Sequence, residues 1–237
     1  MWNSDRRANS LRQLHALNRH FISHLLSAPD DRVPGTKPTP HFVPQLCALD
    51  AAATHELCAT PYTLYYLPFG NVTYWHESAR LNAAGERAAG SFQSRQDATR
   101  DLTELALFLA WHVASTDAAG ARLFFGMSVG TLDFFRQADV ATLAGVATLA
   151  AQVLQPRWQD NPYFWPDLIK SAGTDRIRLQ ATRLLGAQLL AAELCDEHVV
   201  QQAPRRLRRS ILRRTLETAS VTVPPAEQPS PAALAPL

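Results

Sequence analysis

Apolar residues spaced three and four positions apart constrain this chain more than any other feature of its sequence. The clearest run lies in Asp101–Ala118, where one stripe is formed by Leu102, Leu105, Leu109 and Val113. Such spacing places the side chains on one face of an α-helix. Similar patterns predict helices over Ser10–Ser27, Val140–Gln152 and from Thr174 to about Val200. Shorter helices are expected over Asp50–Cys58, Asn71–Leu81 and Val129–Gln137. We therefore predict an all-α protein with a multi-helix, orthogonal or bundle-like core.

Polar residues indicate where several of these helices begin and end. A short side-chain oxygen at the N-cap can accept a hydrogen bond from a free amide of the first turn. N-caps of this kind are predicted at Asp50, Ser128 and Asp139. Asp101 and Glu104 resemble a capping pair at the start of the Leu-rich helix. Gly120 is predicted to end that helix.

The last long helix is predicted to turn an apolar stripe towards the core. One polar residue, Gln188, interrupts this stripe. Its apolar members are Ile177, Ala181, Leu184, Leu185, Ala191, Ala192 and Cys195.

Two aromatic-rich segments, Tyr62–Phe69 and Trp158–Trp165, separate the helices. The first is predicted to be a short strand or an extended segment, and Pro68 argues against a central strand. Aromatic rings can stack on nucleic-acid bases, but Arg157 is the sole basic residue among them. Because aromatics bury a large area, packing in the core or at a subunit interface is the favoured interpretation. The aromatics assigned to an interface are Trp75, Trp158, Phe164 and Trp165.

The two aromatic segments belong to stretches of sequence that resemble each other. Each stretch contains an Asp-capped helix, an extended apolar segment, an aromatic residue, an Asn and an aromatic-Trp pair. The second copy has one extra residue between the aromatic and the Asn. The matched residues are Asp50, Leu64, Phe69, Asn71, Tyr74 and Trp75, and Asp139, Val153, Trp158, Asn161, Phe164 and Trp165. Chance likeness is the alternative; a true repeat predicts a pseudo-duplicated protein, with each Trp buried against helices of its own half.

Composition divides the chain into four regions. Residues 1–95 are predicted to form an N-terminal helix and a small aromatic-rich helical region, and residues 96–203 a helical core. A small polar stretch, Asn82–Asp97, joins the two. Residues 204–220 are predicted to form a basic, Arg-rich helix. Residues 221–237 carry five prolines and are predicted to be a disordered tail.

Several function classes lack the residues that they need. Gly-rich phosphate loops, the G-x-S-x-G elbow and H-E-x-x-H do not occur, so we expect neither enzyme activity nor a cofactor. His20 and His24 share a helix face but have no further ligand in sequence, and the three cysteines form no C-x-x-C; we expect no metal site and no disulfide framework. The first residues predict no secretory signal, and no apolar run reaches the roughly 20 residues of a membrane span. A cytoplasmic location is expected.

The strongest functional signal is the segment Arg205–Glu217. It carries six arginines within ten residues: Arg205, Arg206, Arg208, Arg209, Arg213 and Arg214. On a helix they flank a narrow apolar strip formed by Leu207, Ile211, Leu212 and Leu216. Guanidinium groups bind phosphate in a bidentate way, and a dense row of them releases counterions from a nucleic acid. An anionic membrane surface, an acidic partner helix and a solvated helix end are the alternatives.

Asp101–Ser171 resembles the D subunit of the bacterial flagellar master transcription regulator. The matching features are the Leu-rich run Leu102–Leu107, Asp117 with Ala119, the turn Phe125–Ser128, Leu143 with Leu149, and the step from Val153 to Trp158. This covers about the middle third of the chain, which is much longer than that family and has an N-terminal region and an Arg cluster without counterpart there. The resemblance implies an all-helical, oligomeric regulator that contacts DNA together with a different partner subunit.

These observations predict a non-enzymatic bacterial transcriptional regulator, an activator that binds DNA with a partner subunit and forms homo- or hetero-oligomers. In this hypothesis the arginines contact phosphates, and the aromatic surfaces hold subunits together. The alternative is a cytosolic adaptor or accessory component of a multi-protein machine, such as a secretion apparatus. Its Arg segment would then dock on an acidic partner. An enzyme of unfamiliar type is a third class, for which the sequence offers no residues.

Overall fold

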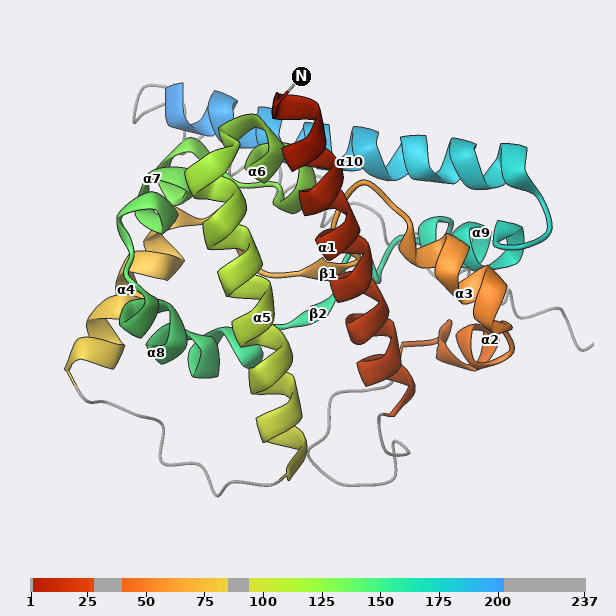
Figure 1. Ribbon diagram of the computed structural model, residues 1–237, viewed down its shortest axis with the longest axis horizontal. Helices are drawn as coiled ribbons and strands as arrows, with labels where there is room; N and C mark the ends of the chain where they lie inside the picture. Colours follow the sequence, from red (N-terminus) through yellow and green to blue (C-terminus); the bar gives the residue numbers. More distant parts are fainter. Residues whose placement is uncertain (1, 28–39, 85–93, 203–237) are drawn as a thin grey trace, which may run out of the picture. The chain divides into compact units, whose positions relative to one another are not determined.

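The computed structural model describes residues 2–27, 40–84 and 94–202, and these ranges form the predicted all-α fold with one small sheet (Figure 1). The helices and strands are α1 (Trp2–Leu26), α2 (Val43–Cys47), α3 (Ala51–Cys58), β1 (Tyr65–Tyr66), α4 (Val72–Ala83), α5 (Ser94–Thr116), α6 (Ala118–Phe125), α7 (Val129–Gln137), α8 (Val140–Ala151), β2 (Gln155–Pro156), α9 (Phe164–Ser171) and α10 (Arg176–Gln202). None of the helices in the described ranges combines the length and apolar character needed to cross a membrane.

Residues 1–195 form one compact unit. The boundary predicted between residues 95 and 96 therefore falls inside a single unit and does not separate two domains. The physical reason is that α1 and α5, which lie on opposite sides of that boundary in sequence, pack against each other (Figure 1). The basic helix predicted over 204–220 and the tail over 221–237 lie outside the described residues.

The two similar stretches of sequence fold into matching structures. Asp139 lies 89 positions after Asp50, and both residues cap a helix, α8 and α3 respectively. Each carboxylate accepts a hydrogen bond of 2.7 Å from the amide three residues later. The order α2–α3–β1–α4 recurs as α7–α8–β2–α9. These matches favour the predicted pseudo-duplication, and we call residues 1–84 and 94–171 the first and second halves.

The two halves meet at the antiparallel pair β1 and β2. Tyr65 pairs with Pro156, and Tyr66 pairs with Gln155. Because Gln155 also lies 89 positions after Tyr66, the pair Tyr66–Gln155 joins equivalent residues of the two halves. The two strands are thus arranged about a local two-fold axis at this pair.

The two tryptophans that end the repeats occupy equivalent buried positions. The indole Nε1 of Trp75 donates to the carbonyl of Pro68 at 2.9 Å, and that of Trp165 donates to the carbonyl of Arg157 at 2.7 Å. Near the start of α4 the Oδ1 of Asn71 accepts a backbone N–H, and Asn161 does the same near α9. These shared polar contacts explain why both copies need the Asn and the Trp.

Each Trp also packs across the boundary between the halves. Trp165 stacks on Phe42 of the first half, with ring centroids 4.3 Å apart. Trp75 contacts Phe135 of the second half, with centroids 5.1 Å apart. The prediction that each Trp is buried against helices of its own half is therefore incomplete. Because each Trp packs against an aromatic ring of the other half, the two halves share one core.

Three of the predicted N-caps are confirmed. Asp50, Ser128 and Asp139 each cap the helix predicted for them. Two predictions at the Leu-rich helix are wrong: α5 begins at Ser94, which leaves Asp101 inside it, and Gly120 lies within α6. The Leu-rich helix ends at Thr116 instead. The next residue, Asp117, is the N-cap of α6, and its carboxylate accepts a hydrogen bond of 3.0 Å from the Gly120 amide.

Candidate functional site

The most distinctive surface of the described protein is provided by α10, whose residues 176–195 belong to the compact unit formed by residues 1–195 (Figure 1). Its buried face is formed by Leu179, Thr182, Gly186 and Leu190. Gly186 lies so close to the ring of Tyr62 that a Cβ at this position would overlap its hydroxyl. Docking of α10 on the first half thus depends on a residue without a side chain.

A buried arginine anchors the middle of α10 to the second half. Arg157 is 2% exposed, and its Nη1 donates to Thr63 Oγ1 at 2.9 Å. Its Nη2 donates to the carbonyl of Phe125 at 3.1 Å and pairs with Glu193 on α10, also at 3.1 Å. Burial lowers the pKa of the Arg157 guanidinium, and the Glu193 carboxylate opposes that shift. The ion pair therefore compensates a charge that has been removed from water.

Trp158 completes this anchor through an unusual backbone conformation. Its φ is +51°, the one positive value among the described residues that are not glycine. Left-handed backbone is costly for a bulky side chain, so surrounding contacts must hold it. The indole Nε1 donates to Glu193 at 2.7 Å, and the ring packs edge-on against Tyr62 and Phe164. Arg157, Trp158 and Glu193 form what we call the α10 anchor.

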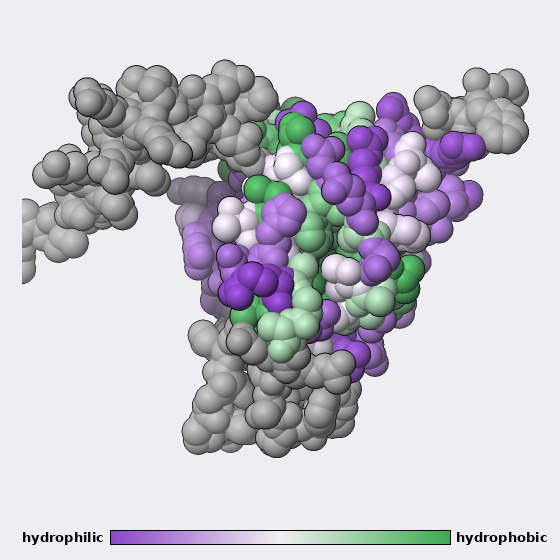
Figure 2. Space-filling view, turned by 90° about the vertical axis from the view of Figure 1, so that its left-hand side faces the viewer, coloured by the Kyte–Doolittle hydropathy of each residue, from purple (hydrophilic) through white to green (hydrophobic). Residues whose placement is uncertain are grey.

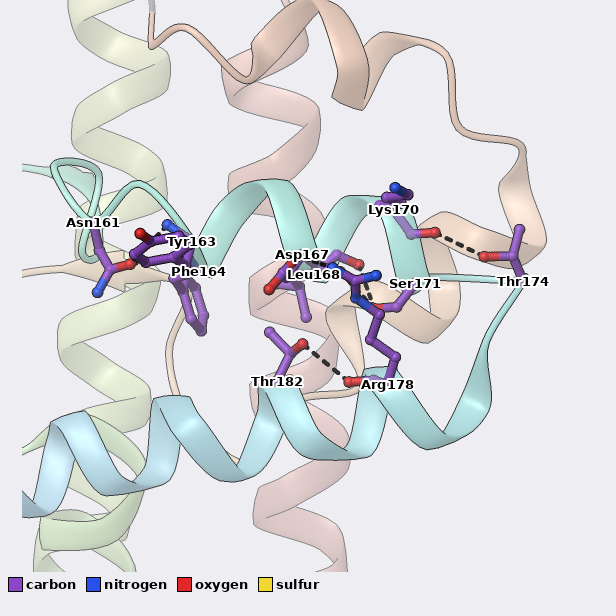
Figure 3. A network of polar contacts seen from close by, with 10 residues as sticks. All are labelled: Asn161, Tyr163, Phe164, Asp167, Leu168, Lys170, Ser171, Thr174, Arg178 and Thr182. Atoms are coloured by element: carbon purple, nitrogen blue, oxygen red, sulfur yellow. Dashed lines mark hydrogen bonds and ion pairs between the residues drawn. The ribbon is translucent and has the colours of Figure 1, made fainter.

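The beginning of α10 is fixed by the turn that follows α9. Asp175 accepts from the backbone N–H of Arg178 at 2.9 Å, as expected of an N-cap. The Arg178 side chain reaches back to pair with Asp167 on α9 (Figure 3). Thr174 donates to the carbonyl of Lys170, which closes the last turn of α9 in the same view. Polar contacts therefore position α10 at its start and at its middle.

The opposite face of α10 is apolar and exposed. Ile177 is 86% exposed and Leu184 is 61% exposed. The other exposed residues on this face are Ala181, Gln188, Ala191 and Cys195. The stripe predicted to face the core is therefore wrong for most of its members. The helix has apolar residues on both sides, and the close approach of Gly186 to Tyr62 decides which side is buried.

The surface over α4, α7 and α8 mixes polar and apolar residues. Figure 2 shows the side of the molecule where α4, α7 and α8 lie in Figure 1, and its apolar residues appear as separate patches among hydrophilic ones. Isolated exposed apolar residues are normal on soluble proteins. The continuous exposed stripe of α10 differs from this background.

A cleft of about 340 Å³ lies beside the α10 anchor. Two of its polar side chains already have partners, since Glu193 binds Arg157 and Trp158, and Asn161 accepts backbone amides at the start of α9. The lining residues are Tyr66, Gln155, Pro156, Trp158, Gln159, Asp160, Asn161 and Glu193. These two lining side chains therefore serve the anchor and the start of α9.

The predicted site residues fall into two groups. Trp75, Phe164 and Trp165 are fully buried in the core of the chain itself, so the interface role expected for them is wrong, because no surface of theirs is left for another subunit. Trp158 is half-buried and belongs to the α10 anchor. The six arginines of the basic segment lie outside the described residues. Sequence reasoning missed Arg157 and Glu193, which only the fold brings together.

Side chains that could suggest metal or thiol chemistry have other roles. The described residues contain no group of three or more His, Cys, Asp or Glu placed to hold a metal. The ring of His24 lies 3.1 Å from Thr99 on α5, within hydrogen-bond distance. Burial raises the pKa of Cys58 to about 12, so this thiol is not a reactive nucleophile.

Comparison with known proteins adds no relative to this picture. No protein-family model, curated protein or solved structure matches the chain.

Proposed function

We propose that this chain is a non-enzymatic, DNA-binding transcriptional regulator that acts in the cytoplasm with a partner subunit. The observation that carries the proposal is the run of six arginines in Arg205–Glu217, which follows α10 directly in the sequence. Guanidinium groups at this density neutralise several backbone phosphates at once and release the counterions bound to them.

The distribution of charge supports a contact surface in this segment. The whole chain carries a net charge of +2. Six arginines against Glu217 give the segment +5, so the rest of the chain carries −3. A uniform preference for arginine would not produce a basic segment on an acidic protein. The asymmetry favours an anionic partner for the segment.

The likeness of Asp101–Ser171 to the D subunit of the flagellar regulator supports a role in transcription together with a partner protein. In that family an all-helical subunit contacts DNA together with a different protein. Under this proposal the exposed face of α10 supplies a contact between proteins, and the arginines supply the contact with DNA.

An adaptor of a multi-protein machine is the second candidate, and one specific observation favours it. The exposed face of α10 is apolar from Ile177 to Cys195 except at Gln188, and exposed apolar faces are typical of surfaces that bind other proteins. In this case the arginines would bind an acidic partner and have no preference for nucleic acid.

DNA binding is tested by fluorescence anisotropy with the full chain and a labelled duplex of mixed sequence. The test variant is Arg208→Gln/Arg209→Gln. The matched control, Arg12→Gln/Arg80→Gln, removes two exposed arginines from α1 and α4. If the two replaced arginines contact phosphates, the slope of log K against log salt falls in magnitude by about two in the test variant alone. Equal slopes, or no binding by the parent, would contradict the proposal and favour the adaptor.

A further inference from the structure

The exposed stripe of α10 has the spacing of a helix-pairing seam. Its members follow one another at intervals of four, three, four, three and four residues: Ile177, Ala181, Leu184, Gln188, Ala191 and Cys195. Alternating steps of three and four are the a and d positions of a heptad, which face a second helix when two helices pair. The seam spans about 27 Å at 1.5 Å per residue. We propose that it binds the α10 seam of a second copy of this chain, with the two helices antiparallel.

An antiparallel arrangement matches every seam position with another seam position. Ile177 lies opposite Cys195 of the second copy, and Ala181 lies opposite its Ala191. Leu184 lies opposite its Gln188, so the two-fold axis passes between these two central layers. No charged residue occurs in the seam. A second copy therefore meets no unpaired charge when the seam is buried, and Gln188 is the single polar residue of the seam.

The charge along α10 selects the antiparallel orientation. In the sequence of this helix the basic residues precede Leu184, and the acidic residues follow Gln188. Arg178, Arg183 and Glu193 already bind Asp167, the carbonyl of Glu56 and the Arg157 side chain within the chain. The charges that select the orientation are therefore Arg176 before the seam and Asp196 and Glu197 after it. A parallel pair would align like charges and helix dipoles. An antiparallel pair sets the basic part of one helix beside the acidic part of the other and opposes the dipoles.

The packing on the other side of α10 leaves the seam free for this contact. Leu179, Thr182 and Leu190 are buried against the chain's own core. The anchor residue Glu193 is held by Arg157 and Trp158. The seam faces away from these contacts, so a second copy can bind without displacing them. This proposal stands independently of DNA binding.

The first test measures the mass of the full chain by sedimentation equilibrium over a range of concentrations. The test variant is Leu184→Glu, which places a charge in the middle of the seam. The matched control is Leu123→Glu on α6, because Leu123 is 62% exposed and Leu184 is 61% exposed. Circular dichroism checks that both variants keep their helices.

The expected result is twice the chain mass of 26.2 kDa for the parent and for the control, and a single chain mass for Leu184→Glu. A parent that stays monomeric at every concentration would overturn the proposal. A dimer that Leu184→Glu leaves intact would also overturn it, since the contact would then lie on another surface.

The second test determines the orientation by disulfide cross-linking under mild oxidation. The background is Cys47→Ser, which removes the other exposed thiol, while Cys58 is buried. Ile177→Cys in this background is expected to form a disulfide between position 177 and Cys195 of the second copy, because the two face each other. The background protein alone is expected to stay uncross-linked. Efficient linkage of Cys195 to Cys195 would show a parallel pair and overturn the antiparallel assignment.

Discussion

The two halves of the protein share a polar framework but differ in the loop that follows the strand. Both use an Asp cap, an Asn at the start of the last helix and a buried Trp that donates to a carbonyl seven or eight residues earlier. In the first half the loop after the strand contains Pro68 and Phe69. At the matching places the second half has Arg157 and Trp158, followed by one extra residue.

This difference gives the second half a task that the first half does not have. The loop of the first half sends Phe69 into the core. The loop of the second half directs Arg157 and the left-handed Trp158 to Glu193, and so attaches α10. A duplicated framework can therefore keep its fold-forming contacts in both copies while one copy acquires a docking role.

The largest effect is expected from the residues where the loops differ. Arg157→Ala removes bonds to three partners and leaves the Phe125 carbonyl and Thr63 hydroxyl without their donor. We expect a loss of about 3–5 kcal/mol in the free energy of unfolding. Pro68→Ala, at the matching position, should change it by about 1 kcal/mol or less. Urea denaturation followed by circular dichroism measures both free energies of unfolding. Equal losses would contradict the claim that the loop of the second half has a stabilising role that the first lacks.

A smaller and equal effect is expected where the halves agree. Trp75→Phe and Trp165→Phe each remove one indole N–H that is donated to a backbone carbonyl, that of Pro68 or Arg157. The Pro68 carbonyl still accepts the backbone N–H of Asn71 in the variant. Each should cost about 1–3 kcal/mol in the free energy of unfolding, measured in the same way. A large cost in one half and none in the other would show that the two tryptophans are not equivalent.

Removal of either Asp cap should lower stability by a similar amount, and by less than the tryptophan substitutions. Asp50→Ala and Asp139→Ala each remove one acceptor from the first turn of α3 or α8. The expected cost is about 0.5–2 kcal/mol each. Differential scanning calorimetry at pH 7 is a suitable measurement. Unchanged melting of both variants would show that neither cap contributes to stability.

The smallest effect concerns a position where the halves differ in charge. His15 on α1 corresponds to Glu104 on α5, 89 positions later. Burial lowers the pKa of His15, and the charges of Arg183 and Arg19 lower it further. The unfolded state, with an ordinary pKa of about 6.5, then binds more protons as the pH falls through that value, so stability decreases with acidification.

His15→Gln should therefore lose less stability than the parent between pH 8 and mildly acidic pH. The urea midpoints of both proteins at the two pH values provide the comparison. An identical pH dependence would show that His15 protonates equally well in the folded and unfolded states.

Sequence patterns predicted the features that depend on neighbouring residues. The caps at Asp50, Ser128 and Asp139 were correct because a cap bonds an amide only three residues away. The matched Asn and Trp positions were visible for a similar reason, since each side chain bonds to a backbone group at most eight residues away.

Features decided by distant residues could not be predicted in the same way. The seam residues Ile177 and Leu184 are as apolar as the core, and the buried face of α10 contains Thr182 and Gly186. The fit of Gly186 on Tyr62 selects that face across more than a hundred residues. Glu193 and Arg157 are likewise joined only by the fold.

The most direct test of this account is hydrogen exchange of α10 in Glu193→Ala. Loss of the carboxylate removes the partner of both Arg157 and Trp158. The account predicts faster exchange over Thr182–Leu194, with α3 and α8 unchanged. The control is Glu77→Ala, which breaks an exposed ion pair on α4 and should leave α10 as it is. Unchanged exchange in α10, or equal acceleration throughout the chain, would contradict the claim that the loop of the second half holds this helix in place.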